Sequence, residues 1–321
     1  MKTVSLSRAL ARTGVYGALF AALLFWGSSF VATKIVLQSF APLDFIFLRF
    51  AGASLLFLPI YLRRRARDME LRTHLALLLL ALFEPCLYFL FETYGLQYTT
   101  ASSASIIIAA APVVVACMAR FFLKERLTRT AWGGVVLSII GVFILAVFAR
   151  PGADGLNAVL KPTPGGRGLL GNILIFLAVV SASGYMMVAR KLSSRLSPLA
   201  ITFYQIVYGG VFFLPFFLFR VRAIDWAAVR PDAFAALGFL ILFSTVSAFL
   251  AYNHALSKID ASRTAVFLNG IPVVTVVVAR VILKERVGII HLLGGLLVVA
   301  GVVISNMGRG RGNGKKLSGM I

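Results

Sequence analysis

Ten apolar stretches, each long enough to cross a membrane, constrain the fold of this chain more than any other feature. A helix needs about 20 mostly apolar residues to span the hydrocarbon core of a bilayer. The first five stretches cover 14–37, 43–62, 73–95, 100–123 and 129–148. The second five cover 168–189, 198–219, 233–256, 261–283 and 288–307. The sequence therefore predicts an all-α membrane protein with ten transmembrane helices.

The composition excludes a set of soluble domains. Sixty per cent of the 321 residues are hydrophobic and 13 per cent are charged, which is typical of an integral membrane protein. The net charge of +21 raises the question of a nucleic-acid partner. The Lys and Arg residues, however, form short clusters between apolar runs, where they act as topology signals and contact anionic lipid headgroups. Nucleic-acid binding is not expected, because it needs a soluble basic surface.

The chain contains an internal duplication. Residues 112–126 and 272–286 share the pattern P-V-V-x4-A-R-x2-L-K-E-R, without a gap and 160 residues apart. Each half then holds five predicted helices, and two similar halves with an odd number of helices cross the membrane in opposite senses. This is the inverted-repeat plan of secondary transporters, which bind their substrate near the midplane between the halves.

The duplication defines the predicted domains. The first five-helix repeat covers 14–148 and the second covers 168–307. A Pro/Gly-rich outer linker, 149–167, joins them, and a basic cytoplasmic tail, 308–321, follows the second repeat. Most of the 32 Lys and Arg residues fall in connections that are cytoplasmic if the N-terminus is inside. The positive-inside rule therefore predicts that both ends of the chain lie in the cytoplasm, with the stronger bias in the first half.

Four charged side chains stand out within the predicted spans: Lys34, Arg49, Glu84 and Glu92. Burying a charge in a bilayer is costly, so each of them marks a functional site by default. Glu84, Tyr88 and Glu92 are four residues apart and share one face of the third helix. Arg49 is either a structural ion-pair partner of Glu92 or the group that meets a carboxylate or phosphate on the substrate.

The two acidic residues of the third helix are the candidates for a coupling proton. Glu84 lies near mid-bilayer without an evident partner at its depth, so it is a candidate proton carrier or a site for a cationic amine. The alternative is a protonated acid that is hydrogen-bonded within the bundle. Pro85 follows directly and frees a backbone carbonyl one turn earlier, which adds polarity at the same level.

Two prolines at matched positions predict breaks in the fourth and ninth helices. Pro112 and Pro272 each loosen a turn beside small or polar residues, Ser105 and Asn269. Discontinuous helices at matched positions are a pointer to a transport site, and kinks without ligand contact are the competing interpretation.

A cavity between the halves is predicted to be lined by polar and aromatic residues. With Arg49, Glu84 and Asn269, the predicted substrate-binding residues are Trp26, Ser29, Tyr88, Ser102, Tyr185, Tyr204, Gln205, Tyr208 and Asn253. The charged triplets that end the fourth and ninth helices are expected to anchor or gate the two membrane faces, since cations favour helix C-termini. These triplets are Lys124, Glu125 and Arg126 inside, and Lys284, Glu285 and Arg286 outside. Direct substrate contact by the triplets is the alternative.

No motif for catalysis, metal binding or nucleotide binding is present. The three histidines are scattered, and the sequence contains no HExxH, GxSxG or phosphate-binding glycine loop. We therefore expect a protein that is not an enzyme and that needs no cofactor or metal.

Several motifs are similar to those of a known family. The segments that carry the similarity are Phe25-Trp26-Gly27-Ser28-Ser29-Phe30, Leu48-Arg49-Phe50, Gly95 to Ser102, and the two A-R-x-x-L-K-E-R ends. With them the chain resembles the EamA-type branch of the drug/metabolite transporter superfamily, over about 14–307. The second half departs from the pattern, because Ala182-Ser183 replaces the Trp-Gly pair and Gln205 replaces the arginine.

This resemblance implies a multi-pass permease of the bacterial inner membrane that exports amino acids or related metabolites by alternating access. The expected partners are a small-molecule substrate and the lipid bilayer, and a monomer and a homodimer both remain open. Efflux or uptake of a drug or organic cation is the alternative transport function. A membrane-embedded subunit of a lipid-processing enzyme and a structural or assembly factor are alternatives of other classes.

Overall fold

A computed structural model describes residues 2–63, 69–122, 128–148, 167–258 and 269–317, and every regular element within these ranges is helical. Seven of the described helices are long and apolar enough to cross a membrane. Three shorter apolar helices lie at Arg129–Leu145, Ile271–Leu283 and Ile289–Ile304. The structure therefore has the all-helical character expected of a membrane protein, and the ten-span layout with its orientation remains a prediction.

The helices follow one another in the order that the apolar runs predict. In the first half they are α1 (Lys2–Val36), α2 (Pro42–Leu62), α3 (Leu71–Ala81), η1 (Leu82–Leu87), α4 (Tyr88–Tyr98), α5 (Ala101–Ile108), α6 (Ala111–Phe122) and α7 (Arg129–Phe148). The second half has α9 (Arg167–Leu192), α10 (Pro198–Arg220), η2 (Val221–Ala223), η3 (Trp226–Ala228), α11 (Pro231–Phe239), η4 (Leu240–Ser247), α12 (Ala248–Leu256), α14 (Ile271–Val278), η5 (Ala279–Leu283) and α15 (Ile289–Leu317). α15 thus continues past 307, where the last predicted span ends.

Local sequence signals explain where several helices begin. Proline occupies the first turn of α2, α10 and α11, a position where its missing N–H costs no hydrogen bond. The Ser197 side chain accepts a hydrogen bond from the Ala200 amide at the start of α10. Thr100 does the same for the Ser103 amide at the start of α5.

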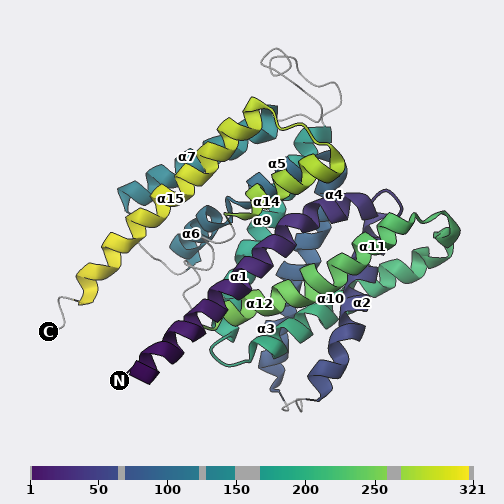
Figure 1. The fold of residues 1–321 in the computed structure, drawn as a ribbon, viewed down its shortest axis with the longest axis horizontal. Coiled ribbons are helices and arrows are strands. Elements are labelled where there is room, and N and C mark those ends of the chain that lie inside the picture. Colours follow the sequence, from purple (N-terminus) through teal and green to yellow (C-terminus); the bar gives the residue numbers. More distant parts are fainter. Residues whose placement is uncertain (1, 64–68, 123–127, 149–166, 259–268, 318–321) are drawn as a thin grey trace.

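The helices pack in pairs that join the two halves of the sequence. α2 lies along α10, and α7 lies along α15 at one edge of the molecule (Figure 1). α1 packs against α12 and α14, whereas α9 packs against α4, α5 and α6. Each half therefore sets its first helix against the third and fourth helices of the other half. The start of α1 and the end of α15 lie toward the same side of the molecule (Figure 1).

The contact between α7 and α15 runs through glycines, which we call the glycine seam. A methyl group on Gly141 would lie 2.8 Å from the Gly294 carbonyl oxygen, and one on Gly301 would lie 2.6 Å from the Gly134 carbonyl oxygen. Small residues allow this approach of two backbones in a membrane. Gly134 and Gly294 are equivalent in the sequence repeat, as are Gly141 and Gly301, so the contact is reciprocal.

The third and eighth predicted spans are each interrupted by a π-helical stretch, which the apolar pattern did not predict. η1 separates α3 from α4, and η4 separates α11 from α12. Inside η1 the backbone of Glu84 leaves helical geometry, with φ −147° and ψ 114°, and the Glu84–Pro85 peptide bond is cis. Ser244 of η4 lies 160 residues after Glu84, so the two interruptions occupy equivalent places. Such stretches occur frequently at functional sites.

The prolines of the repeat lie at the start of a helix segment. The chain turns at Ala109-Ala110, between α5 and α6, and Pro112 lies in the first turn of α6. Pro272 lies in the first turn of α14, directly after the turn at Asn269-Gly270. Each proline therefore follows a turn of the backbone.

Two large apolar clusters form the core. One gathers side chains of α1, α3, α5, α9 and α12, and the other gathers side chains of α2, α4, α10 and α11. Trp26, Tyr88 and Tyr204 are partly buried and pack against both clusters. These three aromatic residues therefore mark the boundary between the two clusters.

Candidate functional site

Arg49 lies at the centre of a buried polar site between the halves. Its side chain is 1% exposed, and its guanidinium group reaches from α2 to η4. Nε donates a hydrogen bond to Thr245 Oγ1 at 2.7 Å, and Nη2 donates to Ser244 Oγ at 2.9 Å. The guanidinium carbon also lies 4.4 Å from the centre of the Phe89 ring, a cation–π contact. The third nitrogen, Nη1, has no hydrogen-bond partner.

The hypothetical ion pair between Arg49 and Glu92 does not form in this structure. Ion pairs within the described residues join Arg220 to Asp44 and Arg230 to Asp232, and Arg49 takes hydroxyl partners instead. Glu92 is buried, and its Oε2 atom lacks a hydrogen-bond partner. Glu84, Tyr88 and Glu92 still lie near enough to the guanidinium to interact with it electrostatically. The site therefore combines one cation with two carboxyl groups that are not directly bonded to it.

Trp26 forms one wall of this site. Its Nε1 donates to the Ser244 backbone carbonyl at 3.1 Å, so the indole and the guanidinium of Arg49 meet at the same residue. The ring packs against Phe249 and Tyr252, with centroid distances of 5.3 and 5.1 Å. The Tyr252 hydroxyl is buried and has no hydrogen-bond partner. An aromatic wall with one unpaired hydroxyl group therefore borders the polar centre.

Helices of the second half hold η1 on the other side of the site. Ser181 of α9 donates to the Phe83 carbonyl at 2.7 Å, which satisfies a backbone group at the interruption. Gly209 of α10 faces Pro85 so closely that a methyl group there would overlap the proline ring. Gln205 lies one turn earlier on α10, near enough to Tyr185 to interact with its hydroxyl, and neither buried polar atom of its amide makes a hydrogen bond of good geometry.

A short hydrogen-bond chain joins three helices of the second half. The Tyr185 hydroxyl donates to Asn253 Oδ1 at 2.9 Å, and Asn253 Nδ2 donates to Thr202 Oγ1 at 2.9 Å. Asn253 is therefore bonded within the bundle and fixes the orientation of Tyr185.

The centre of the molecule thus contains several buried polar atoms with unused hydrogen-bonding capacity. They are Arg49 Nη1, Glu92 Oε2, Tyr252 Oη and the Gln205 amide atoms. A buried polar atom without a partner costs about 1–3 kcal/mol, so most of them are paired in folded proteins. Arg49 Nη1 donates, Glu92 Oε2 accepts when ionised, and the amide and hydroxyl groups do both. Such a set can bind a small molecule that carries both an anionic and a cationic group.

Other predicted residues lie away from this centre. Tyr204 and Tyr208 belong to an aromatic cluster with Tyr61 and His74, near the end of α2 and the start of α3. The Tyr208 hydroxyl lies 2.7 Å from His74 Nδ1, and the hydroxyls of Tyr61 and Tyr204 are 3.3 Å apart. This cluster joins α2, α3 and α10 at what we call the α2–α3 end of the bundle.

Three more of the predicted substrate-binding residues lie in α1, in α4 and at the turn before α14. Ser29 donates back to the Trp26 carbonyl at 2.7 Å within α1. Tyr88 makes an edge contact with Phe89, 4.9 Å between ring centres. The Asn269 Oδ1 atom, at the turn before α14, lacks a hydrogen-bond partner.

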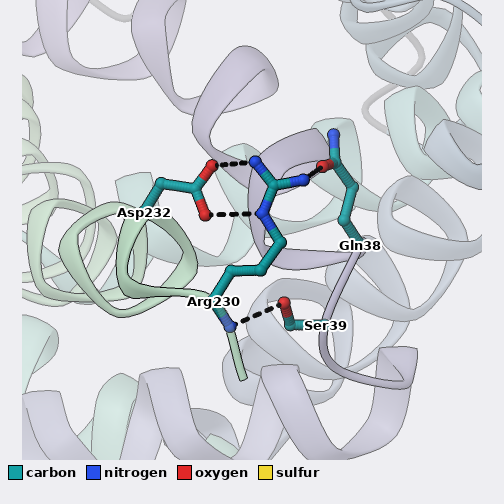
Figure 2. Close-up of polar contacts among 4 residues, drawn as sticks. All are labelled: Gln38, Ser39, Arg230 and Asp232. Carbon is teal, nitrogen blue, oxygen red and sulfur yellow. Dashed lines mark hydrogen bonds and ion pairs between the residues drawn. The ribbon is translucent and has the colours of Figure 1, made fainter. Parts of the chain in front are cut away.

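At the opposite end of the bundle, where α1 leads into α2, polar contacts hold the two halves together. We call this the α1–α2 end. The Arg230 guanidinium bonds Asp232 and the Gln38 side chain, and its backbone amide donates to Ser39 (Figure 2). Ser102 lies at the same end and donates to Glu285 at 2.8 Å. Ser102 is thus part of this end and not of the central site.

The charged triplets fall partly within the structure. Lys284, Glu285 and Arg286 line a cavity of about 650 Å³ at the α1–α2 end, together with Lys34. Lys124, Glu125 and Arg126 lie outside the described residues.

Sequence reasoning missed the residues that hold Arg49 and η1. Thr245 and Ser181 are small hydroxyl residues, which are common in membrane helices, so no pattern singled them out. Tyr252 was equally inconspicuous in an apolar run. Ser244 stands out in the sequence as the repeat equivalent of Glu84, but its bond to Arg49 is not evident there.

Comparison with known proteins identifies the chain's relatives. The EamA-like transporter family matches residues 13–147 and again residues 169–307. The uncharacterized transporter YcxC of Bacillus subtilis is 34% identical, over 88% of this chain and 89% of YcxC. The uncharacterized transporter YetK of the same organism is 29% identical, over 91% of this chain and 86% of YetK.

Two further matches are more distant. A probable terminal-alkyne amino-acid exporter of Streptantibioticus cattleyicolor is 27% identical, over 88% of this chain and 89% of the exporter. A protein of known crystal structure aligns with a TM-score of 0.62 at 17% identity, over 92% of this chain and 98% of that protein, which shows the fold alone.

The family and the names of these relatives indicate a transporter rather than an enzyme. The apolar helices make the chain an integral, multi-pass membrane protein, and its bacterial relatives support a place in the inner membrane. With both halves matched, the chain belongs to the EamA-like transporter family, within the drug/metabolite transporter superfamily.

Proposed function

We propose that this protein is a secondary-active, alternating-access transporter that exports a small metabolite with a carboxylate group, an amino acid or a related compound. The observation that carries the proposal is the buried set of unpaired polar atoms around Arg49, between the two halves. The other partner is the lipid bilayer that surrounds the helices.

The roles of the residues follow from their geometry. Ser244 and Thr245 occupy two of the three guanidinium nitrogens, which fixes the plane of Arg49 and leaves Nη1 for a substrate carboxylate. Glu92 offers a carboxyl oxygen to a substrate ammonium group. Trp26 packs against the substrate's apolar part. A substrate of this kind supplies hydrogen bonds that the protein lacks by itself.

Two features support alternating access. The glycine seam is reciprocal, as expected for halves related by a two-fold axis. The helices that carry Glu84 and Ser244 are interrupted at equivalent places, which supplies backbone that can rearrange between two states.

The acidic residues are proposed to carry the coupling proton. Glu84 and Glu92 are both buried close to Arg49, and neither is bonded to a cation in the described part of the chain. Replacing Glu84 by Gln removes a titratable group with little change of shape. We expect this variant to lose flux driven by a pH gradient in proteoliposomes, and undiminished coupled flux would remove Glu84 from the mechanism.

A second candidate function is transport of an organic cation or drug. The unpaired Glu92 oxygen, and Tyr88 near enough to interact with Glu92 electrostatically, favour this interpretation. It predicts that binding depends on Glu92 more than on Arg49. Loss of cation binding in Glu92→Gln, with Arg49→Ala unaffected, would favour it over a carboxylate substrate.

A thermal-stability screen of the purified protein tests the proposal. A ligand present at roughly 100 times its Kd stabilises the folded state by about 2.7 kcal/mol. We expect amino acids or related carboxylates to raise the unfolding temperature of the unaltered protein and not that of Arg49→Ala. A ligand set made only of amines, or shifts that survive in Arg49→Ala, would contradict a carboxylate site at this arginine.

A further inference from the structure

The tight corner between α4 and α5 is held by charges from two other elements. α4 ends at Tyr98 and α5 begins at Ala101, so Thr99 and Thr100 alone connect them. Lys34 of α1 donates from Nζ to the Thr99 carbonyl at 2.7 Å, at the C-terminus of α4. A cation at a helix C-terminus and an anion at a helix N-terminus are both favourable, and Lys34 supplies the cation.

Glu285 supplies the anion, and it comes from the other half of the chain. Its carboxylate accepts hydrogen bonds from the Ala101 amide at 2.9 Å, the Ser102 amide at 3.2 Å and the Ser102 hydroxyl at 2.8 Å. The first amides of α5 have no acceptor within the helix, so a carboxylate there supplies the hydrogen-bond acceptor that they lack. Lys34 is near enough to Glu285 to interact with it electrostatically.

The backbone around Glu285 is built to present this carboxylate. η5 ends at Leu283, and Lys284 adopts a left-handed conformation, with φ 56° and ψ 28°. The Glu285 amide then donates to the Ala279 carbonyl at 3.2 Å, which closes the end of the helix. The side chain that follows this reversal points across the boundary between the halves.

The contact lies beside a cavity at the α1–α2 end. This cavity, of about 650 Å³, is lined by Lys34, Gln97, Thr100 and Glu285 among others. Below the contact α5 is closed, because Ser102 is 1% exposed and Ser105, one turn deeper, is fully buried. The carboxylate therefore lies between an open cavity and a buried helix face.

We propose that Glu285 is a latch that holds the α1–α2 end of the transporter shut, and that release of its carboxylate from the start of α5 opens this end. The inference deepens the proposed function and rests on it, since a latch has a use in a protein that alternates its access. All three hydrogen bonds are made to one charged group, so each is stronger than a bond between neutral groups. Because one side chain accepts all three, its movement breaks them at the same time. Glu285→Gln removes this carboxylate. The glutamine keeps one accepting oxygen, but its nitrogen cannot accept a hydrogen bond from the α5 amides.

Thiol labelling tests the latch. Ser105→Cys places a thiol behind the contact, and a membrane-impermeant maleimide reports when it becomes accessible in the full-length protein in proteoliposomes. We expect Glu285→Gln to raise the labelling rate at position 105 about tenfold or more, given the strength of hydrogen bonds to charged groups. Protein without the introduced cysteine gives the background from Cys86 and Cys117.

Two controls separate the latch from general loosening. Asp225→Asn changes an exposed carboxylate at the same end that accepts from the Ala227 and Ala228 amides of its own turn, and it should leave labelling at position 105 unchanged. Gln97→Cys lies on an already exposed position and should label equally with and without Glu285. An unchanged rate at position 105 in Glu285→Gln, or an equal rise in Asp225→Asn, overturns the proposal.

A milder variant covers the case in which Glu285→Gln does not fold. Ser102→Ala removes one of the three hydrogen bonds and should raise labelling about threefold. No rise in that variant also overturns the latch. Labelling needs no substrate, so an unchanged labelling rate would overturn the latch and leave the proposed carboxylate site at Arg49 standing. Absence of ligand binding, with the labelling result as expected, would instead refute the proposed transport function.

Discussion

At the scale of single residues, Arg49 shows how a membrane protein keeps a buried cation without a bonded anion. Two hydroxyl groups of η4 and the face of Phe89 replace part of the water that the guanidinium loses. A charge this deep was predictable from sequence, because charged residues are rare inside apolar runs. Its partners were not, since Ser244 and Thr245 look like ordinary small residues of a membrane helix.

Variants at Arg49 and around it should separate charge from geometry. Arg49→Lys keeps the charge but loses the planar guanidinium group that donates to both hydroxyls. We therefore expect a carboxylate ligand to bind about tenfold more weakly, or weaker still. Ser244→Ala removes one of these bonds and should weaken binding about three- to tenfold. Titration of the ligand by calorimetry measures both effects.

Ser54 gives the matched control for these variants. Its hydroxyl bonds the Phe50 carbonyl within α2, away from the guanidinium, so Ser54→Ala should leave the affinity unchanged. Equal affinities for the Arg49→Lys variant and the unaltered protein would show that Arg49 does not bind the ligand.

At the scale of helices, the apolar runs predicted most helix ends, but they did not predict where the third and eighth spans are interrupted. The spans expected at 43–62, 129–148 and 198–219 agree with α2, α7 and α10 within one residue. The π-helical stretches η1 and η4 were not foreseen, because a π-helical turn changes the hydrogen bonding of the backbone and leaves its hydrophobicity unchanged. Pro85 was a signal for the first of them, and nothing comparable marks the second.

The fit of η1 against α10 gives a prediction at this scale. A methyl group on Gly209 would overlap Pro85, whereas one on Gly210 would meet its nearest neighbour, Ser54 Oγ, at 3.6 Å, an ordinary contact. Gly209→Ala should therefore lower the free energy of unfolding by about 1–3 kcal/mol. Gly210→Ala should change it by no more than about 1 kcal/mol, toward stabilisation, because alanine favours the helix.

Thermal unfolding of both variants in detergent measures the difference. Equal unfolding temperatures for the two alanine variants would mean that η1 does not press against α10 at Gly209.

At the scale of the whole molecule, the glycine seam joins the two halves through equivalent glycines of α7 and α15. Gly141→Ala and Gly301→Ala should each destabilise the protein, by about 1–3 kcal/mol, since each methyl group would press on a backbone atom of the partner helix. Gly133→Ala is the control, because a methyl group there has no neighbour within 4 Å. Unfolding temperatures that fall for one seam variant alone would argue against the reciprocal contact.

The number of spans is a second property of the whole molecule. Ten crossings leave both ends of the chain on one face of the membrane, whereas seven, an odd number, leave them on opposite faces. The start of α1 and the end of α15 lie toward the same side of the structure, so we expect cytoplasmic reporters fused to either end to be active (Figure 1). Reporters that place the two ends on opposite faces of the membrane would rule out the ten-span arrangement.

Flux across a membrane is the property on which the proposed function depends. The measurement is uptake of a radiolabelled amino acid, chosen from the thermal screen, into proteoliposomes loaded with the same unlabelled compound. The unaltered protein should accumulate label by exchange, and Arg49→Ala, reconstituted to the same density, should not exceed protein-free vesicles. Equal uptake by Arg49→Ala and the unaltered protein would contradict a transport site built around this arginine.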